Sequence, residues 1–147
     1  MNTQENLKAS GSLLVVITGK DGQVKEEHEF KNLVVTTGKN FVASRMVGTA
    51  SNVMSHMAIG SSSTAAAAGD TALGTELGRV ALTSGTATGA VATYTATFPA
   101  GTGTGAVVEA GIFNAASAGT MLCRTVFAVV NKGADDAMSI TWTVTIS

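Results

Sequence analysis

The chain has 147 residues, 13% of them charged, and 9 Lys and Arg nearly balance 10 Asp and Glu for a net charge of −1. This length suits one domain with a substantial core. Near-neutrality disfavours a nucleic-acid-binding protein, which usually shows a basic surface, and a weakly charged surface favours self-association or incorporation into an assembly. Because the chain has no apolar run of about 20 residues and its N-terminus is polar, we expect neither a membrane partner nor a signal peptide.

The chain begins with a polar segment, and residues 1–11 are predicted to form a flexible arm in front of a single β domain at 12–147. Ser12 to Thr18 is a compact apolar strand, and the Asp-Gly pair at 21–22 predicts a turn because it tolerates positive φ. The chain then returns as a second strand over Gln23 to Phe30. Its highly charged stretch, Lys25 to Glu29, is typical of an exposed edge kept soluble by charge.

A strand is predicted over Asn32 to Thr36, followed by one short helix at about 39–47. Phe41, Val42, Arg45 and Met46 have helical spacing, and Gly48 closes the helix. Another strand is predicted over Val53 to Gly60.

The next part of the chain, Ser61 to Arg79, is rich in Ser, Ala and Gly and is predicted to be an ordered surface loop with one short turn at most. Residues 80–108 contain no charged side chain. Within them, alternation over Val91 to Phe98 predicts a strand, and Pro99 to Gly105 a loop.

Three more strands are predicted over 107–114, 121–130 and 138–147. The last alternates without interruption, placing Met138, Ile140, Trp142, Val144 and Ile146 on one face and only Ser and Thr on the other. Strands separated by Gly-rich turns predict a mainly β fold: an antiparallel β-sandwich or jelly-roll-like barrel with one short α-helix.

The candidates for catalysis are His28, His56 and Cys123. Nucleophilic catalysis needs a base beside the nucleophile, but the histidines lie in separate predicted strands and Cys123 has no partner base in its sequence neighbourhood. We therefore interpret them as surface or core residues, expect no catalytic residues, and predict that the protein is not an enzyme.

Two other motifs resemble ligand sites only superficially. Asp135 and Asp136 lack the pattern of a Ca²⁺ loop and are interpreted as part of a solvated hairpin turn. The glycines from Gly101 to Gly105 are not followed by the Lys-Ser/Thr pair of a phosphate loop. We expect no metal and no cofactor.

Glu109, Arg79 and Arg124 are isolated charges in apolar or Gly- and Thr-rich stretches. Isolated charges tend to be paired if they are buried. We expect Glu109 to pair with Arg79 or Arg124 and so to fix strand register or a subunit contact; three independent surface charges are the alternative.

Several motifs from residue 31 onward resemble small structural proteins of tailed bacteriophages. The motifs are Lys-Asn-Leu-Val-Val-Thr-Thr-Gly-Lys-Asn-Phe-Val-Ala-Ser-Arg (31–45), Met-Ala-Ile-Gly (57–60), Gly-Asp-Thr-Ala-Leu-Gly-Thr-Glu-Leu-Gly-Arg (69–79), Glu-Ala-Gly-Ile-Phe-Asn-Ala (109–115), Arg-Thr-Val-Phe (124–127) and Val-Asn-Lys-Gly (130–133). Their order also looks like the attachment region of some phage tail-fibre and collar proteins. The resemblance covers roughly four fifths of the chain.

The resemblance implies a virion protein assembled in the bacterial host cytoplasm. A single domain with a polar arm suits a capsid decoration (cement) protein that binds between capsomers and stabilises the head, with the phage major capsid protein and further copies of itself (a dimer or trimer) as partners. A short tail, collar or fibre-base protein is the alternative within the virion. A carbohydrate-binding β-sandwich is the alternative of another class, and it would need Tyr94 or Trp142 on an exposed face.

Overall fold

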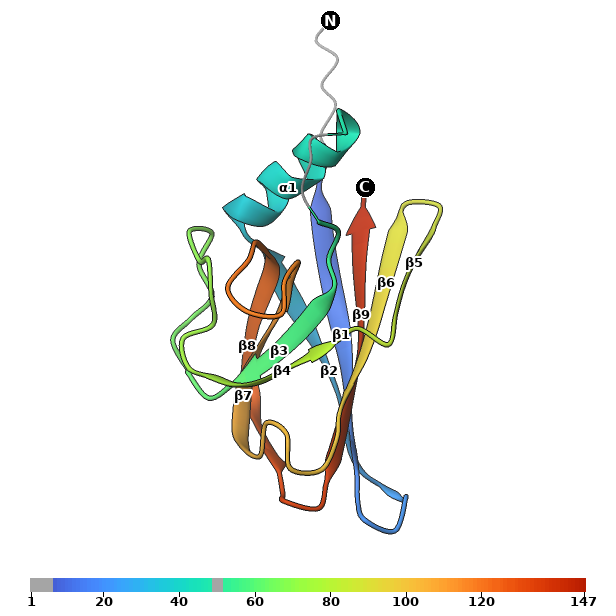
Figure 1. Cartoon of the computed structure of the whole chain (residues 1–147), viewed down its shortest axis with the longest axis vertical. Helices are drawn as coiled ribbons and strands as arrows, with labels where there is room; N and C mark the ends of the chain where they lie inside the picture. Colours follow the sequence, from blue (N-terminus) through green and yellow to red (C-terminus); the bar gives the residue numbers. More distant parts are fainter. Residues whose placement is uncertain (1–6, 49–51) are drawn as a thin grey trace, which may run out of the picture.

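The computed structural model describes residues 7–48 and 52–147, which form nine strands and one helix. These are β1 Ala9–Thr18, β2 Val24–Val34, α1 Thr36–Met46, β3 His56–Gly60, β4 Glu76–Ala81, β5 Ser84–Thr88, β6 Val91–Phe98, β7 Gly105–Phe113, β8 Met121–Lys132 and β9 Ala137–Ile146. The strands form one antiparallel sheet in the order β4-β3-β7-β8-β2-β1-β9-β6-β5, which curls into a half-barrel (Figure 1). The predicted mainly β, barrel-like fold with one short helix is confirmed.

The main hydrophobic core fills the inner, concave side of this sheet. Trp142 of β9 is fully buried and pairs with Leu13 of β1 on one side and with Tyr94 of β6 on the other. The apolar face predicted for the last strand is therefore core, and Met138 and Ile140 of the same face are buried with Trp142. Burying such side chains supplies about 1.5–3 kcal/mol each, which stabilises the curled sheet.

β1 and β2 form the predicted hairpin. Its turn is closed by hydrogen bonds from Gly22 N to the Gly19 carbonyl (3.0 Å) and from Gln23 N to Asp21 Oδ1 (2.9 Å), and Gly22 has φ +80°. β1 begins at Ala9, earlier than the expected start at Ser12, because Lys8 and Ser147 already exchange backbone hydrogen bonds (2.6 and 2.8 Å). Residues 1–6 of the expected arm lie outside the described residues.

The two strands predicted over 23–30 and 32–36 are one continuous strand, β2. β2 pairs with β8 only at Leu33 and Val34, whereas its pairing with β1 extends back to Val24. The charged stretch from Lys25 to Glu29 thus lies on a local sheet edge, as its composition predicts.

Helix α1 begins at Thr36, earlier than the predicted start at about residue 39, and lies across one end of the sheet (Figure 1). Thr37 Oγ1 donates to the Met121 carbonyl of β8 (2.9 Å), which fixes the first turn to the sheet. Gly38 is buried against the backbone of Leu122, where any Cβ would collide. The predicted closure is confirmed: Gly48 has φ +68° and donates to the Arg45 carbonyl (3.3 Å).

Two strands were not predicted. β4 covers Glu76–Ala81, so the expected loop over Ser61 to Arg79 ends in a strand that pairs with β3. β5 covers Ser84–Thr88, a run of Ser, Gly, Thr and Ala without apolar alternation, and it pairs with β6 through the turn at Gly89, whose φ is +58°.

Candidate functional site

The outer, convex side of the sheet has two different halves. On β5, β6, β9 and β1 the outward positions are mostly Ser and Thr, and we call this surface the hydroxyl face. Its members are Ser10, Ser12, Ser84, Thr86, Thr88, Thr93, Thr95, Thr97, Ser139, Thr141, Thr143 and Thr145. All are exposed or half-buried. The uncharged polar face predicted for the last strand is thus shared by four neighbouring strands.

Strand register aligns these hydroxyls in rows across the sheet. Ser12, Thr143, Thr93 and Thr86 are successive cross-strand partners in one row. Hydroxyls within the rows bond one another, as between Ser12 and Thr143 (Oγ to Oγ1, 3.1 Å). The pairs Ser84–Thr95 (2.6 Å) and Thr97–Ser139 (3.1 Å) are of the same kind. The face is thus an ordered polar surface with spare donors and acceptors, since each hydroxyl has one donor and two acceptor positions.

The other half, the outer side of β3, β7 and β8, is covered by residues 61–75, which we call the covering segment. Glu109 of β7 lies beneath it, fully buried. Its Oε2 accepts hydrogen bonds from the backbone N–H of Ser62 (2.9 Å) and Thr75 (2.8 Å), and its Oε1 from that of Gly74 (2.8 Å). One carboxylate therefore holds both ends of the covering segment against the sheet.

Arg124 of β8 completes this attachment. Its Nη2 lies 3.0 Å from Glu109 Oε1 and also donates to the Thr64 carbonyl (2.9 Å), while its Nη1 bonds Asp70 Oδ2 (2.8 Å). The predicted ion pair of Glu109 is confirmed, and its partner is Arg124. The pair lies within one chain and joins the neighbouring strands β7 and β8. Arg79 instead pairs with Glu76 of its own strand (2.7 Å).

The hydrogen bonds keep Glu109 ionised in spite of its burial. Burial alone would raise its pKa, but the N–H groups of Thr75, Ser62 and Gly74, together with Arg124, outweigh it and hold the pKa below the ordinary value. Burial likewise opposes ionisation of Asp70, whose pKa is lowered overall by the Ala67 N–H and by Arg124. The buried guanidinium thus faces two anions, so its charge is compensated.

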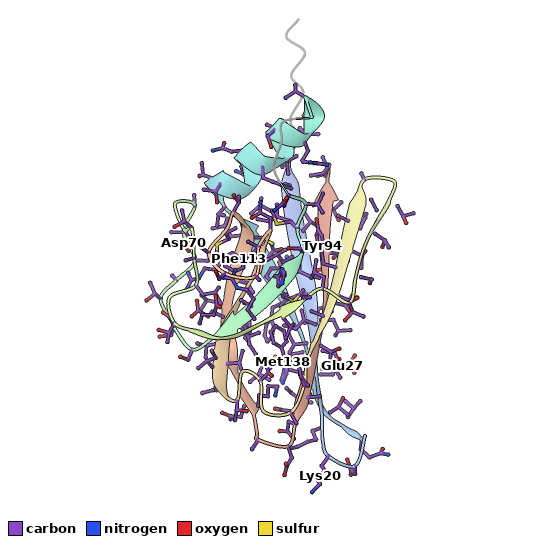
Figure 2. All side chains as sticks on the ribbon, viewed as in Figure 1. Lys20, Glu27, Asp70, Tyr94, Phe113 and Met138 are labelled. Atoms are coloured by element: carbon purple, nitrogen blue, oxygen red, sulfur yellow. The ribbon has the colours of Figure 1, made fainter. Side chains whose placement is uncertain are left out.

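A small second core seals the covered half. Leu73 of the covering segment packs with Val35, Ala58, Phe113 and Met121 on the outer side of the sheet. The Arg79 guanidinium lies 3.8 Å from the centre of the Phe113 ring. Its Nη1 donates to the carbonyls of Ala115 (3.0 Å) and Ala118 (2.9 Å). The covering segment can be found in Figure 2 from the label of Asp70, one of its residues, at the left of the molecule.

Residues of the motifs quoted from the sequence converge in this half. Gly60, Asp70, Leu73, Glu109 and Arg124 come from four of those motifs, yet all contact the covering segment or belong to it. A Cβ at Gly60 would meet both the Thr75 carbonyl and the Glu109 carboxylate, so only glycine fits. These residues attach a loop to a sheet, which is a structural role.

A second buried charge cluster, not foreseen from the sequence, lies at the opposite end of the sheet from α1. Lys132 of β8 is buried and its Nζ donates to the carbonyls of Pro99 (2.8 Å) and Asp136 (2.7 Å). Burial lowers its pKa, against the opposite effect of Asp136. The Asp136 carboxylate is bonded by Gly133 N (2.9 Å) and Lys25 Nζ (3.0 and 3.1 Å), so this turn is not simply solvated, although Asp135 is exposed.

The three candidates for catalysis lie apart with separate partners. His28 stacks on Phe30 of β2 (5.9 Å between ring centroids), and His56 Nδ1 lies 2.8 Å from Ser55 Oγ. Cys123 is buried in the main core, and burial raises its pKa well above the ordinary value, against a smaller effect of Asn32. The thiol is therefore protonated at neutral pH and poorly nucleophilic.

Residues 7–48 and 52–147 contain no group of three or more His, Cys, Asp or Glu side chains arranged to hold a metal ion. In the same part of the chain, no helix has the length and hydrophobicity needed to cross a membrane. Comparison with protein-family models, with curated proteins and with solved structures finds no match to this chain.

Proposed function

We propose that this chain is a structural protein of a tailed-bacteriophage virion, and specifically a capsid decoration protein that binds between capsomers. The observation that carries the proposal is the hydroxyl face: an ordered, uncharged surface across four strands, exposed or half-buried, over which none of the residues 7–48 and 52–147 forms a covering segment. Its hydroxyls offer donors and acceptors to a neighbouring protein without the desolvation cost of charges. The sequence motifs that resemble phage structural proteins support the same proposal.

The partners in this proposal are the major capsid protein and further copies of the chain. Many modest contacts repeated by symmetry add up to a large total stabilisation of the particle, because a bound copy that engages several sites at once makes the later contacts at high effective concentration. The sugar-binding alternative has less support: Trp142 is fully buried, and Tyr94 pairs with it on the inner side of the sheet, so neither ring lies on the hydroxyl face.

The decisive experiment is to locate and count labelled copies of the chain on purified virions. A decoration protein appears in hundreds of copies over the head, and labelled copies with Thr141→Lys, at an exposed position of the hydroxyl face, bind less. A handful of copies at one vertex would instead indicate a tail, collar or fibre-base protein. Absence from virions would overturn the proposal.

The arm is tested by removing residues 1–6, because β1 begins at Ala9 and a longer deletion would remove strand residues. If the arm grips neighbouring subunits, the truncated chain keeps its thermal stability but binds particles more weakly. Equal affinity with and without these residues would exclude the gripping role.

A further inference from the structure

β5 is an exposed edge of the sheet. It is the last strand in the sheet order, it pairs with β6 alone among the described strands, and all five of its residues are exposed. Figure 1 shows it at the right-hand side of the molecule, with open space beyond it. In an antiparallel ladder, alternate residues direct their backbone N–H and C=O groups away from the paired strand. β5 therefore offers unpaired backbone donors and acceptors to another chain.

This edge lacks the features that usually prevent strand pairing, which are charges, prolines, bulges and covering loops. Its residues, Ser84–Thr88, include no charge and no proline, and its register with β6 is regular. Two other edges of the sheet differ in this respect. The local edge of β2 carries the charged stretch Lys25 to Glu29, and in β4 Gly78 lies against the backbone of Gly103 in the loop that follows β6.

We propose that β5 pairs antiparallel with β5 of a second copy, around a two-fold axis at Thr86. This symmetry places Thr86 opposite the partner's Thr86 and Ser84 opposite the partner's Thr88. Any charged residue on the axis would face its own like charge, which destabilises a strand pair, whereas hydroxyls tolerate the arrangement. The same cross-strand hydroxyl pairing already exists within the chain between Ser84 and Thr95 (2.6 Å).

The hydrogen-bonding pattern of the β5–β6 hairpin is compatible with this axis. β5 and β6 are joined by a two-residue turn between the paired residues Thr88 and Val91, and such a turn makes the flanking pair hydrogen-bonded. By alternation, Gly85 and Ala87 then direct their backbone groups outward. A two-fold axis at Thr86 places Gly85 opposite the partner's Ala87, so the outward groups meet in register and both side chains are too small to obstruct them.

The pairing is weak by itself because a five-residue strand buries far less than the roughly 1,200 Å² of a stable interface. The dimer therefore depends on concentration in solution and is reinforced where copies are held side by side. The inference rests on the proposed function, which includes self-association. It adds which strand the two copies pair through and in which register.

Disulfide trapping tests the register. Cysteines replacing Thr86 would face each other at a Cα separation of about 4.5–5.5 Å, within disulfide range, whereas cysteines replacing Thr88 would be about 14 Å apart. Under mild oxidation Thr86→Cys yields covalent dimers and the matched control Thr88→Cys does not, while the native Cys123 stays buried. Equal trapping of both variants, or of neither, would overturn the register.

Introducing a positive or a negative charge at Thr86 tests the two-fold symmetry in the full chain. By analytical ultracentrifugation, Thr86→Lys and Thr86→Glu each dimerise about five-fold more weakly than the unmodified chain. An equal mixture of the two variants dimerises as well as the unmodified chain, because Lys then faces Glu. Ala65→Lys, at an exposed site of the covering segment and outside the hydroxyl face, dimerises normally. Unaltered dimerisation of both Thr86 variants, or a chain that is monomeric at every concentration, would refute the pairing. A dimer that never joins virions would refute only the proposed function.

Discussion

The covered half and the hydroxyl face are two parts of the outer side of one sheet, yet they are built from different chemistry. In the covered half, Glu109 and Arg124 are buried charges that hold a segment rich in small residues against the strands. On the hydroxyl face, Ser and Thr bond across strands and remain accessible. Leaving a buried charge unpaired is costly, which disfavours arrangements that break these contacts, whereas exposed hydroxyls exchange partners with water at little cost. The first half is specialised for internal attachment and the second is suited to contact with other molecules.

The largest effect is expected from removing the carboxylate that attaches the covering segment. Glu109→Ala leaves Arg124 buried with only Asp70 as a counter-ion and should cost about 3–5 kcal/mol of unfolding free energy. Urea denaturation measures the loss. Glu76→Ala is the matched control because Glu76 is exposed and Arg79 keeps its bonds to the Ala115 and Ala118 carbonyls, so the loss should be under about 1 kcal/mol. Similar losses in both variants would remove the distinction between the two kinds of pair.

A smaller effect is expected at Gly60. The Cβ of Gly60→Ala would push against the Thr75 carbonyl and the Glu109 carboxylate, and overpacking of this kind costs about 1–3 kcal/mol. Gly69→Ala, in the same covering segment but with open space around it, should change stability by less than about 0.5 kcal/mol. Thermal melting compares the two. Limited proteolysis should show faster cleavage within residues 61–75 for Gly60→Ala only, and equal cleavage would mean that the segment is held elsewhere.

Acid should loosen the covered half. The pKa values of Glu109 and Asp70 are lower in the folded chain than their unfolded values of about 4.3 and 3.9. Because a depressed carboxyl pKa stabilises the folded state above the unfolded pKa, this stabilisation is present at neutral pH. It is lost as the pH falls below about 4 and through the folded pKa values. Urea midpoints from pH 7 to 2 should therefore fall more steeply for the unmodified chain than for Glu109→Gln, and parallel curves would contradict the assignment.

The smallest effect on folding is expected on the hydroxyl face. Thr141 is exposed, so Thr141→Ala should change the unfolding free energy by less than about 0.5 kcal/mol, which chemical denaturation measures. A loss above about 1 kcal/mol would show that this face carries internal stability as well.

The sequence predicted those features that depend on local pattern or on an isolated charge. Strict alternation located β6 and β9, and the lone Glu109 indicated a buried pair. β5 was missed because Ser-Gly-Thr-Ala-Thr has no apolar period, and its pairing depends on the turn at Gly89. The role of Asp70 was missed since it depends on the covering segment folding back over β8, which no local signal reveals. Long-range packing decided the second case, and the turn decided the first.

The way in which the covering segment is attached has a consequence for how its sequence can change. Glu109 binds the backbone N–H groups of Ser62, Gly74 and Thr75, and Arg124 binds the backbone carbonyl of Thr64. Since every residue except proline provides both groups, these attachments are largely indifferent to the side chains between them. The side chains at exposed positions such as Ser63 and Ala65 can therefore change without breaking these backbone attachments. A foreign peptide inserted there would be displayed on a firmly anchored loop.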